Sequence, residues 1–147
     1  MTRRGLWLQI AVLALAIVCI GCNEIKEEHF ASIKVARASH MAEKGWVPSF
    51  LPEDTREISV LGDLDAGSVY GTYSSNAIAA LRKHCENADD SIHVPGYGPD
   101  WFTDTLKKAD TAVALRRRGF DVLQCEDGFR IVAFGARQFG YYWSVGR

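Results

Sequence analysis

The sequence predicts an α+β domain in which about five antiparallel strands pack against two or three helices. Apolar residues recur at helical spacing in the first half of the chain, whereas the last third has short apolar runs joined by brief turns. Strands joined by such short connections are antiparallel. The 147 residues are 48% hydrophobic and 24% charged, which suits one packed core. We therefore predict a single globular domain over residues 32–147.

The first 22 residues have the pattern of an export signal. Arg3 and Arg4 precede an apolar run of 15 residues, Leu6 to Ile20, and Gly21-Cys22 follows it. A small residue before cysteine is typical of bacterial lipoprotein processing. We predict that residues 1–21 are a lipoprotein signal peptide and that Cys22 becomes the lipidated first residue of an exported protein anchored to a membrane.

Two alternatives for this segment stay open. Gly5 to Cys22 could remain as an uncleaved membrane anchor, although the apolar run is short for a spanning helix, which needs about 20 residues. Thr2 to Trp7 also resembles a twin-arginine export signal. In either case residues 22–31, which are mostly polar, are expected to form a tether.

The first helix is expected from about Ile33 to Lys44. Ser32 is a suitable N-cap, and apolar residues follow at spacings of three and four. Gly45 can take the left-handed conformation that ends a helix. Phe30, just before the cap, is expected to anchor the modest apolar face of the helix.

A proline-rich connector and a hairpin come next. Pro48 and Pro52 favour an extended segment over residues 46–52, whose apolar side chains are expected to enter the core. Strands are expected around residues 58–61 and 68–73, with a turn between them. The apolar residues of the connector are Trp46, Val47, Phe50 and Leu51.

This stretch resembles a group of uncharacterised bacterial lipoproteins. In that group a helix ends in Gly-Trp, an apolar residue, proline and Leu-Pro follow, and a strand beginning with Ile leads to an Asp-Leu-Asp turn. The sequence departs from the group at residues 54–55 and 66–67. The resemblance implies an exported lipoprotein and brings no activity with it. The matching residues are Gly45, Trp46, Val47, Pro48, Leu51, Pro52, Ile58, Asp63, Leu64 and Asp65.

The rest of the chain predicts two further helices and a meander. A second helix is expected from about Asn76 to Glu86, then a loop over residues 87–100, and a short third helix that begins at Pro99-Asp100. Three strands are expected from Gly119 to the end of the chain, joined by turns at 127–128 and 137–138. We expect the helices to cover one face of the sheet.

Cys85 and Cys125 remain if Cys19 is removed with the signal and Cys22 is lipidated. Two cysteines in an exported protein favour a disulfide. The alternative is a zinc site formed with His84 and His93. The segment from Asp63 to Gly67 resembles the start of a calcium loop, but its glycine comes too early, so a turn is favoured. No metal and no cofactor is predicted.

Two groups of residues are candidates for partner binding. The aromatic residues beside the long loop are Tyr97, Trp101 and Phe102, and they either form a recognition surface or close the open end of the sheet. The basic residues are Arg116, Arg117 and Arg118, which with Lys107 and Lys108 either face solvent or meet an anionic partner.

The net charge and the lack of known catalytic motifs in the sequence narrow the possible functions. Removal of residues 1–21 takes away Arg3 and Arg4 and no acidic residue, so 15 basic and 18 acidic side chains give a net charge of −3. Nucleic acid is therefore a poor partner. No residues are predicted to be catalytic, because the sequence has no nucleophile elbow or phosphate-binding loop. We predict a binding or structural module of the cell envelope that holds a protein or polymer. The alternative is a small periplasmic hydrolase or enzyme inhibitor with a cleft near residues 87–102.

Overall fold

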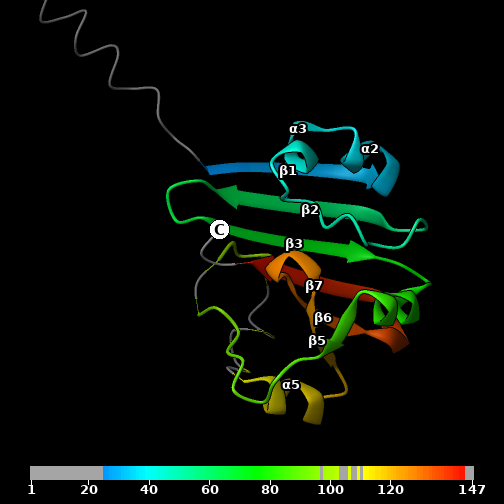
Figure 1. The fold of residues 1–147 in the computed structure, drawn as a ribbon, viewed down its shortest axis with the longest axis vertical. Helices are drawn as coiled ribbons and strands as arrows, with labels where there is room; N and C mark the ends of the chain where they lie inside the picture. The colour runs from blue at the N-terminus through cyan, green and yellow to red at the C-terminus, as the bar shows by residue number, and fades with distance from the viewer. Residues whose placement is uncertain (1–24, 97, 103–105, 107–108, 110, 145–147) are drawn as a thin grey trace, which may run out of the picture.

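The computed structural model describes residues 25–96, 98–102, 106, 109 and 111–144. Its centre is one antiparallel sheet with the strand order β1-β2-β3-β7-β6-β5-β4 (Figure 1). The α+β prediction is confirmed at this level, but seven strands replace the predicted five. The strands are β1 Ile25–Ser32, β2 Arg56–Asp63, β3 Ser68–Ser74, β4 Cys85–Asn87, β5 Asp121–Cys125, β6 Arg130–Phe134 and β7 Phe139–Ser144.

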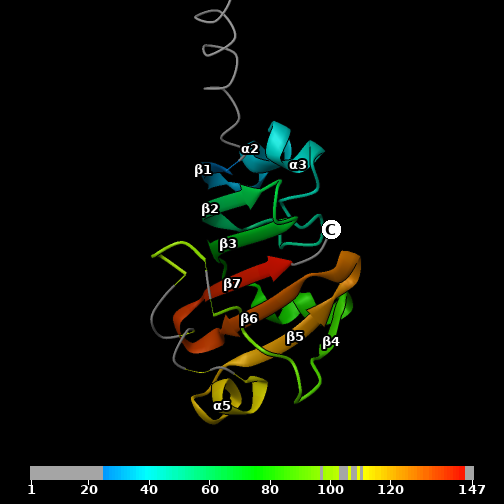
Figure 2. The same cartoon turned by 90° about the vertical axis from the view of Figure 1, so that its left-hand side faces the viewer.

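The helices within the described residues are short, and they lie in the connections between strands. Figure 2 shows α2 and α3 at the β1 end of the sheet and α5 at the opposite end. No helix in the described ranges has the length and apolar character needed to cross a membrane. The α-helices are α2 Ile33–Arg37, α3 His40–Glu43 and α5 Ala112–Arg117; the 3₁₀ helices are η1 Ile78–Lys83, η2 Glu126–Gly128 and η3 Gly135–Arg137.

The expected tether is largely a strand. Ile25–Ser32 forms β1, which pairs along its length with β2. Sequence reasoning missed it because an edge strand needs few apolar residues, and Phe30 is the only buried side chain in β1. The prediction of a tether over residues 22–31 is thus wrong from Ile25 onward, because these residues belong to the sheet.

The first predicted helix is interrupted. Ser32 caps α2 by accepting a hydrogen bond from the Val35 amide, as its sequence position suggested. The Ser39 hydroxyl, however, donates to the Ala36 carbonyl oxygen at 2.6 Å, and a new helix, α3, starts at His40. Serine hydroxyls that bond nearby backbone compete with a continuous helix in this way. Gly45 ends α3 with a φ of 71°, as predicted.

Three aromatic rings lie directly over glycines on one face of the sheet. Gly71 on β3 pairs with Tyr142 on β7, and a Cβ at Gly71 would stand 2.0 Å from the Tyr142 ring. Gly140 has the reciprocal relation to Tyr73, at 2.5 Å. The Trp46 ring covers Gly62 on β2, where a Cβ would lie 2.2 Å away. Trp46 of the connector is therefore a core residue held against the sheet, as its position predicted.

The second predicted helix is shorter than expected. The structure has the 3₁₀ helix η1 and then β4, so Cys85 and Glu86 belong to a strand. Cys85 lies directly opposite Cys125 on β5, and the two sulfur atoms form a disulfide. This confirms the predicted pair and leaves no thiolate at these positions for the alternative zinc site.

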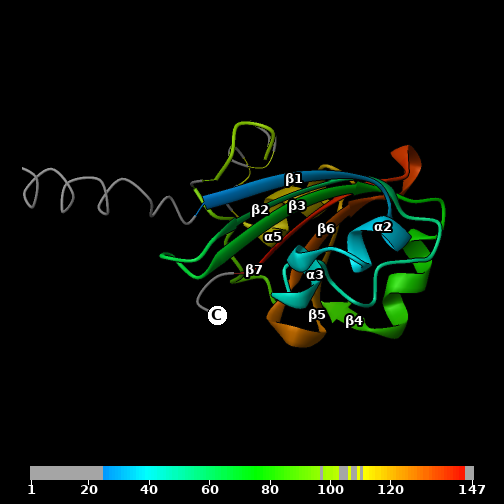
Figure 3. The same ribbon diagram turned by 90° about the horizontal axis from the view of Figure 1, so that it is seen from above.

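Both faces of the sheet carry a hydrophobic cluster, and the expectation that helices cover only one face is wrong. The first face is covered by α2, α3, the 46–52 connector and η1. The second face is covered by α5 and the segment between β4 and α5. Figure 3 shows α2 and α3 on one side of β1, with the segment before α5 on the other side.

The covering of the second face depends on a helix that the sequence analysis did not predict. Thr111 caps α5 by accepting a hydrogen bond from the Ala114 amide at 3.2 Å, and Gly119 follows it with a φ of 84°. Ala112 and Leu115 are its buried residues. The third helix expected after Pro99-Asp100 lies largely outside the described residues, and Trp101 there is in a turn.

Candidate functional site

Among the described residues, the second face of the sheet is only partly covered over β1 and β2, where Leu61 packs against the second cluster and Trp101 reaches Glu27. Side chains alternate along a strand, so β1 turns every second residue toward this face, and those residues are exposed. We call this surface the open face; it consists of Glu27, His29, Ala31, Ser59, Leu61 and Thr72.

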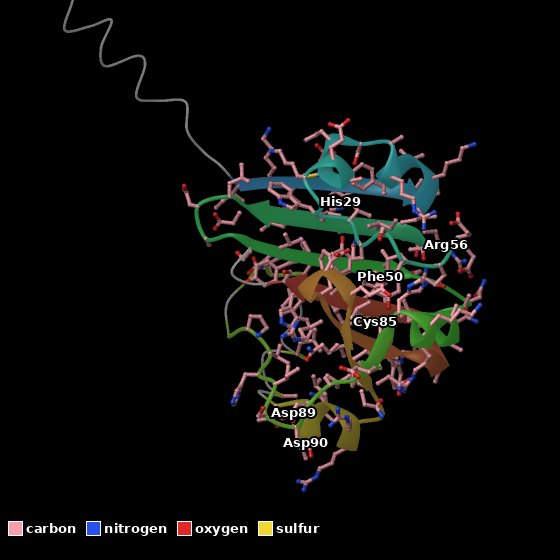
Figure 4. The ribbon with its side chains drawn as sticks, viewed as in Figure 1. His29, Phe50, Arg56, Cys85, Asp89 and Asp90 are labelled. Carbon is pink, nitrogen blue, oxygen red and sulfur yellow. A yellow bond between two sulfur atoms is a disulfide. The ribbon has the colours of Figure 1, made fainter. Side chains whose placement is uncertain are left out.

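A polar row crosses the open face at right angles to the strands. His29 on β1 is directly opposite Ser59 on β2, which is opposite Thr72 on β3. The His29 Nδ1 atom lies 2.8 Å from the Ser59 hydroxyl. Since directly opposite side chains on one face are close neighbours, the strand register itself brings these groups together. Figure 4 places His29 over the β1 and β2 strands.

Glu27 joins this row to the long loop. One Glu27 carboxylate oxygen, Oε1, accepts a hydrogen bond from the indole Nε1 of Trp101 at 2.6 Å. The same oxygen lies 3.6 Å from His29 Nε2. The His29 side chain is 68% exposed and that of Glu27 is 40% exposed. The imidazole and the carboxylate are thus held in place while solvent still reaches them.

A bulge shapes the end of the open face. The pairing of β2 with β3 shifts between Arg56 and Ser59, and Glu57 within the shift has a φ of 51°. The Ser74 hydroxyl and the Glu57 carboxylate are 3.0 Å apart and form a hydrogen bond. A hollow of about 340 Å³ lies here, lined by His29, Phe30, Ala31, Glu57, Ile58 and Ser59. Bulges commonly redirect side chains in this way at sheet edges.

The aromatic candidates separate in the structure. Phe102 is fully buried and packs edge-to-face against Tyr70, Tyr141 and Trp143 at centroid distances of 5.1 to 6.0 Å. Its proposed partner-binding role is therefore wrong, and the ring closes the core of the second face. Trp101 is half-buried at the border of the open face, and Tyr97 lies outside the described residues.

The basic candidates also separate. The Arg116 guanidinium donates hydrogen bonds to the Asp90 carboxylate and to the Ala88 carbonyl oxygen, so it ties α5 to the preceding loop. Arg117 and Arg118 are exposed at the end of α5. The exposed pair lies at the opposite end of the sheet from the open face. Lys107 and Lys108 lie outside the described residues.

A second hollow, of about 360 Å³, lies beside the disulfide. It is lined by residues 82–86 and 124–126. His84 Nδ1 lies 3.2 Å from the Glu126 carboxylate, and its ring stacks on Phe50 at 5.9 Å. Within the described residues, no three or more His, Cys, Asp or Glu side chains are placed to hold a metal ion.

Two carboxyl groups with lowered pKa values are turn elements. Hydrogen bonds from Ser75, and from the Asn76 amide, lower the pKa of Asp54 and outweigh the opposing effect of burial. Hydrogen bonds from Ser91 lower the pKa of Asp89. The predicted turn at Asp63 is similar, because one of its carboxylate oxygens accepts from the Ala66 amide at 3.0 Å. These carboxylates stabilise local backbone.

Sequence reasoning did not single out Glu27, His29 or Ser59. The alternation of Glu27, His29 and Ala31 in β1 was hidden because residues 22–31 were interpreted as a tether. The signal that could have revealed this face is Phe30 among polar neighbours, which is the pattern of an edge strand with one buried contact.

A family model described as the YbbD head domain matches residues 24–74. The match covers about a third of the chain and runs from the start of β1 to the end of β3, so it includes the three strands that carry the open face. No curated protein and no solved structure matches the chain.

Proposed function

We propose that this protein is an exported, membrane-anchored binding module that holds a polymer of the cell envelope on its open face. The observation that carries the proposal is the polar row of His29, Ser59 and Thr72, with Glu27 and Trp101 beside it. These residues offer hydrogen-bonding groups and an indole on an accessible surface, beside the hollow lined by His29 and Ser59.

The chemistry of this surface favours a polar, hydroxyl-rich partner such as a glycan. A carboxylate accepts hydrogen bonds, while an imidazole and two hydroxyls can donate or accept them. The Trp101 indole adds apolar contact area beside them. An apolar partner would instead leave these polar groups without hydrogen bonds, at a cost of about 1–3 kcal/mol for each buried group.

The N-terminal sequence supports the location. Arg3 and Arg4, the apolar run that follows and the Gly21-Cys22 junction are typical of a processed bacterial lipoprotein. The uncleaved anchor would also hold the domain at a membrane. Two cysteines joined as a disulfide fit an exported protein, because the cytosol keeps thiols reduced.

A hydrolase is the second candidate, and one observation favours it. Ser59, His29 and Glu27 form a row of hydroxyl, imidazole and carboxylate with contacts of 2.8 and 3.6 Å. This is the order of groups in a nucleophile, base and orienting acid. Acyl transfer also needs donors for an oxyanion, and the residues from Ser59 to Leu61 are paired with strands on both sides. Binding is therefore the better-supported role.

Co-sedimentation of the purified full chain with insoluble envelope glycan tests the proposal. His29→Ala combined with Ser59→Ala should weaken capture by about tenfold or more, since central contacts dominate binding energy. Lys34→Ala, which changes an exposed residue of α2, is the matched control and should leave capture unchanged.

Failure of the unaltered protein to sediment with glycan would contradict the polymer proposal. Capture of a single envelope protein through the same residues would show that the partner is a protein and that the polymer proposal is wrong. If Ser59→Ala alone abolished ester or amide hydrolysis while capture stayed intact, the hydrolase would be the correct function.

A further inference from the structure

Two exposed large apolar side chains lie together at one end of the sheet. Ile25, Val35 and Leu64 are the large apolar side chains found exposed in the described part of the chain, at 51%, 55% and 46%. Ile25 opens β1 and lies directly opposite Asp63, the residue before Leu64. Two of the three are therefore neighbours, whereas Val35 is on α2 beyond the other end of β1.

The end that carries Ile25 and Leu64 is also the end nearest the membrane anchor. Cys22 is followed by Asn23 and Glu24, and β1 begins at Ile25. Three residue steps can span at most about 11 Å. This distance holds for a lipidated Cys22 and for an uncleaved apolar segment that ends there, because both place residue 22 at the membrane.

The turn between β2 and β3 lies at this same end. Figure 1 shows it beside the start of β1, with α2 at the opposite end of the strand. The turn exposes Leu64 and Ala66 and is held by the bond from the Ala66 amide to Asp63. A short anchor therefore brings a turn with an exposed leucine to the membrane surface.

From this placement we propose that Ile25 and Leu64 form a membrane contact that seats the domain on the bilayer holding its own anchor. The partner of this contact is a lipid surface, because the segment from Cys22 to Ile25 is too short to hold this end of the sheet away from the membrane. Apolar side chains of interfacial segments enter the boundary between headgroups and acyl chains by about 5–10 Å. The inference rests on the membrane anchoring in the proposed function.

Charge indicates which lipid surface fits. Asp63 and Asp65 flank Leu64, and Lys26 follows Ile25. The acidic residues disfavour a surface of anionic headgroups, where like charges repel. A zwitterionic surface should therefore be the better partner. The membrane contact would also set the orientation of the open face, because β1 would then run away from the membrane from Ile25 to Ser32.

Photolabelling from within the bilayer tests this contact. The full chain, purified from membranes, is returned to vesicles of phosphatidylcholine that carry a diazirine on an acyl chain, and modified residues are located by mass spectrometry. Ile25 and Leu64 should be labelled, and Val35 should not. Leu64→Gln should remove most labelling from residues 63–67, whereas Val35→Gln, the matched control, should leave it unchanged. Added phosphatidylglycerol should lower the labelling at low salt.

Equal labelling of Leu64 and Val35, or absence of label from both Ile25 and Leu64, would overturn the membrane contact. The intact mass of the same preparation separately identifies the anchor as an acylated Cys22 or an uncleaved segment. Glycan capture is measured on the same variants, so a failed contact is distinguishable from a failed binding function. Leu64→Gln and Val35→Gln should both keep full capture in detergent.

Discussion

The two faces of the sheet differ in how completely they are covered. On the first face, buried residues extend from Phe30 on β1 to Cys85 on β4, so the cluster crosses the whole sheet. On the second face the fully buried residues stop at β3, β2 contributes the half-buried Ser59 and Leu61, and β1 carries the exposed Glu27 and His29. The strands are the same, so the difference comes from the connections.

Connection length explains the difference. The first face receives α2, α3 and the connector, which together fill the chain between β1 and β2. Among the described residues, the second face receives the segment from β4 to α5, which starts at the opposite edge of the sheet. A fully packed face contributes stability, and a partly covered face leaves groups available for binding.

We call the fully covered first face the closed face. Loss of the disulfide should have the largest effect on stability, because the disulfide joins β4 to β5 at the edge of this face. Cys85→Ser with Cys125→Ser opens a loop with a sequence separation of 40. The chain-entropy model gives a loss of about 4 kcal/mol in the free energy of unfolding. Urea unfolding of the variant, compared with the oxidised protein, measures this; a difference under about 1 kcal/mol would contradict the prediction.

Gly71→Ala should disrupt the packing at the centre of the closed face. The new Cβ would stand 2.0 Å from the Tyr142 ring, so the ring or the strand must move. Overpacking of this kind costs about 1–3 kcal/mol, and we expect the upper end because Tyr142 is fully buried. Gly96→Ala is the control, since a Cβ there meets no atom within 4 Å. Thermal unfolding of both variants compares them.

Two buried tyrosines of the closed face should respond oppositely to loss of their hydroxyl. The Tyr142 hydroxyl donates to the Trp46 carbonyl oxygen at 3.2 Å, so Tyr142→Phe should cost about 1 kcal/mol. The Tyr73 hydroxyl is buried without a hydrogen-bond partner among the described residues, so Tyr73→Phe should be neutral or stabilising. Equal losses in urea unfolding would show that the Tyr73 hydroxyl is bonded.

Asp54 should make a smaller, pH-dependent contribution at the margin of the closed face. Its pKa is lowered from 3.8 in the folded state, chiefly by the bond from Ser75. A lowered pKa stabilises the folded protein above the unfolded pKa, and this stabilisation is lost as the pH falls through the folded value. Asp54→Asn should therefore cost about 0.5–1 kcal/mol at pH 7 and less near pH 2, because the carboxylate is largely exposed. An unchanged difference across this range in urea unfolding would contradict it.

The open face should show the smallest effect on stability. His29→Ala and Ser59→Ala each remove exposed or half-exposed groups, so each should change the free energy of unfolding by less than about 0.5 kcal/mol. Together they should still weaken glycan capture. A large loss of stability would show that the polar row serves the fold, and it would remove the contrast between the two faces.

The sequence alone determined the features that depend on neighbouring residues or on a strong composition signal. Ser32 as a helix cap, Gly45 as a helix end and the buried Trp46 were all predicted correctly, because caps, left-handed glycines and proline-flanked apolar residues act locally. The last three strands were also predicted, since their apolar runs and turns are adjacent in the chain. The disulfide was predicted because Cys85 and Cys125 are the two cysteines left once Cys19 and Cys22 are assigned to the export signal and the lipid anchor.

Only the tertiary structure decided which surfaces are available. β1 is a strand because β2 supplies its hydrogen bonds, and a mostly polar segment does not show which residues, some 30 positions away, will pair with it. Phe102 and Trp101 are adjacent in sequence, yet packing against β7 buries one and the hydrogen bond to Glu27 holds the other at the border. The row of His29, Ser59 and Thr72 exists because strand register aligns three residues that are distant in the chain, and register is a property of the assembled sheet.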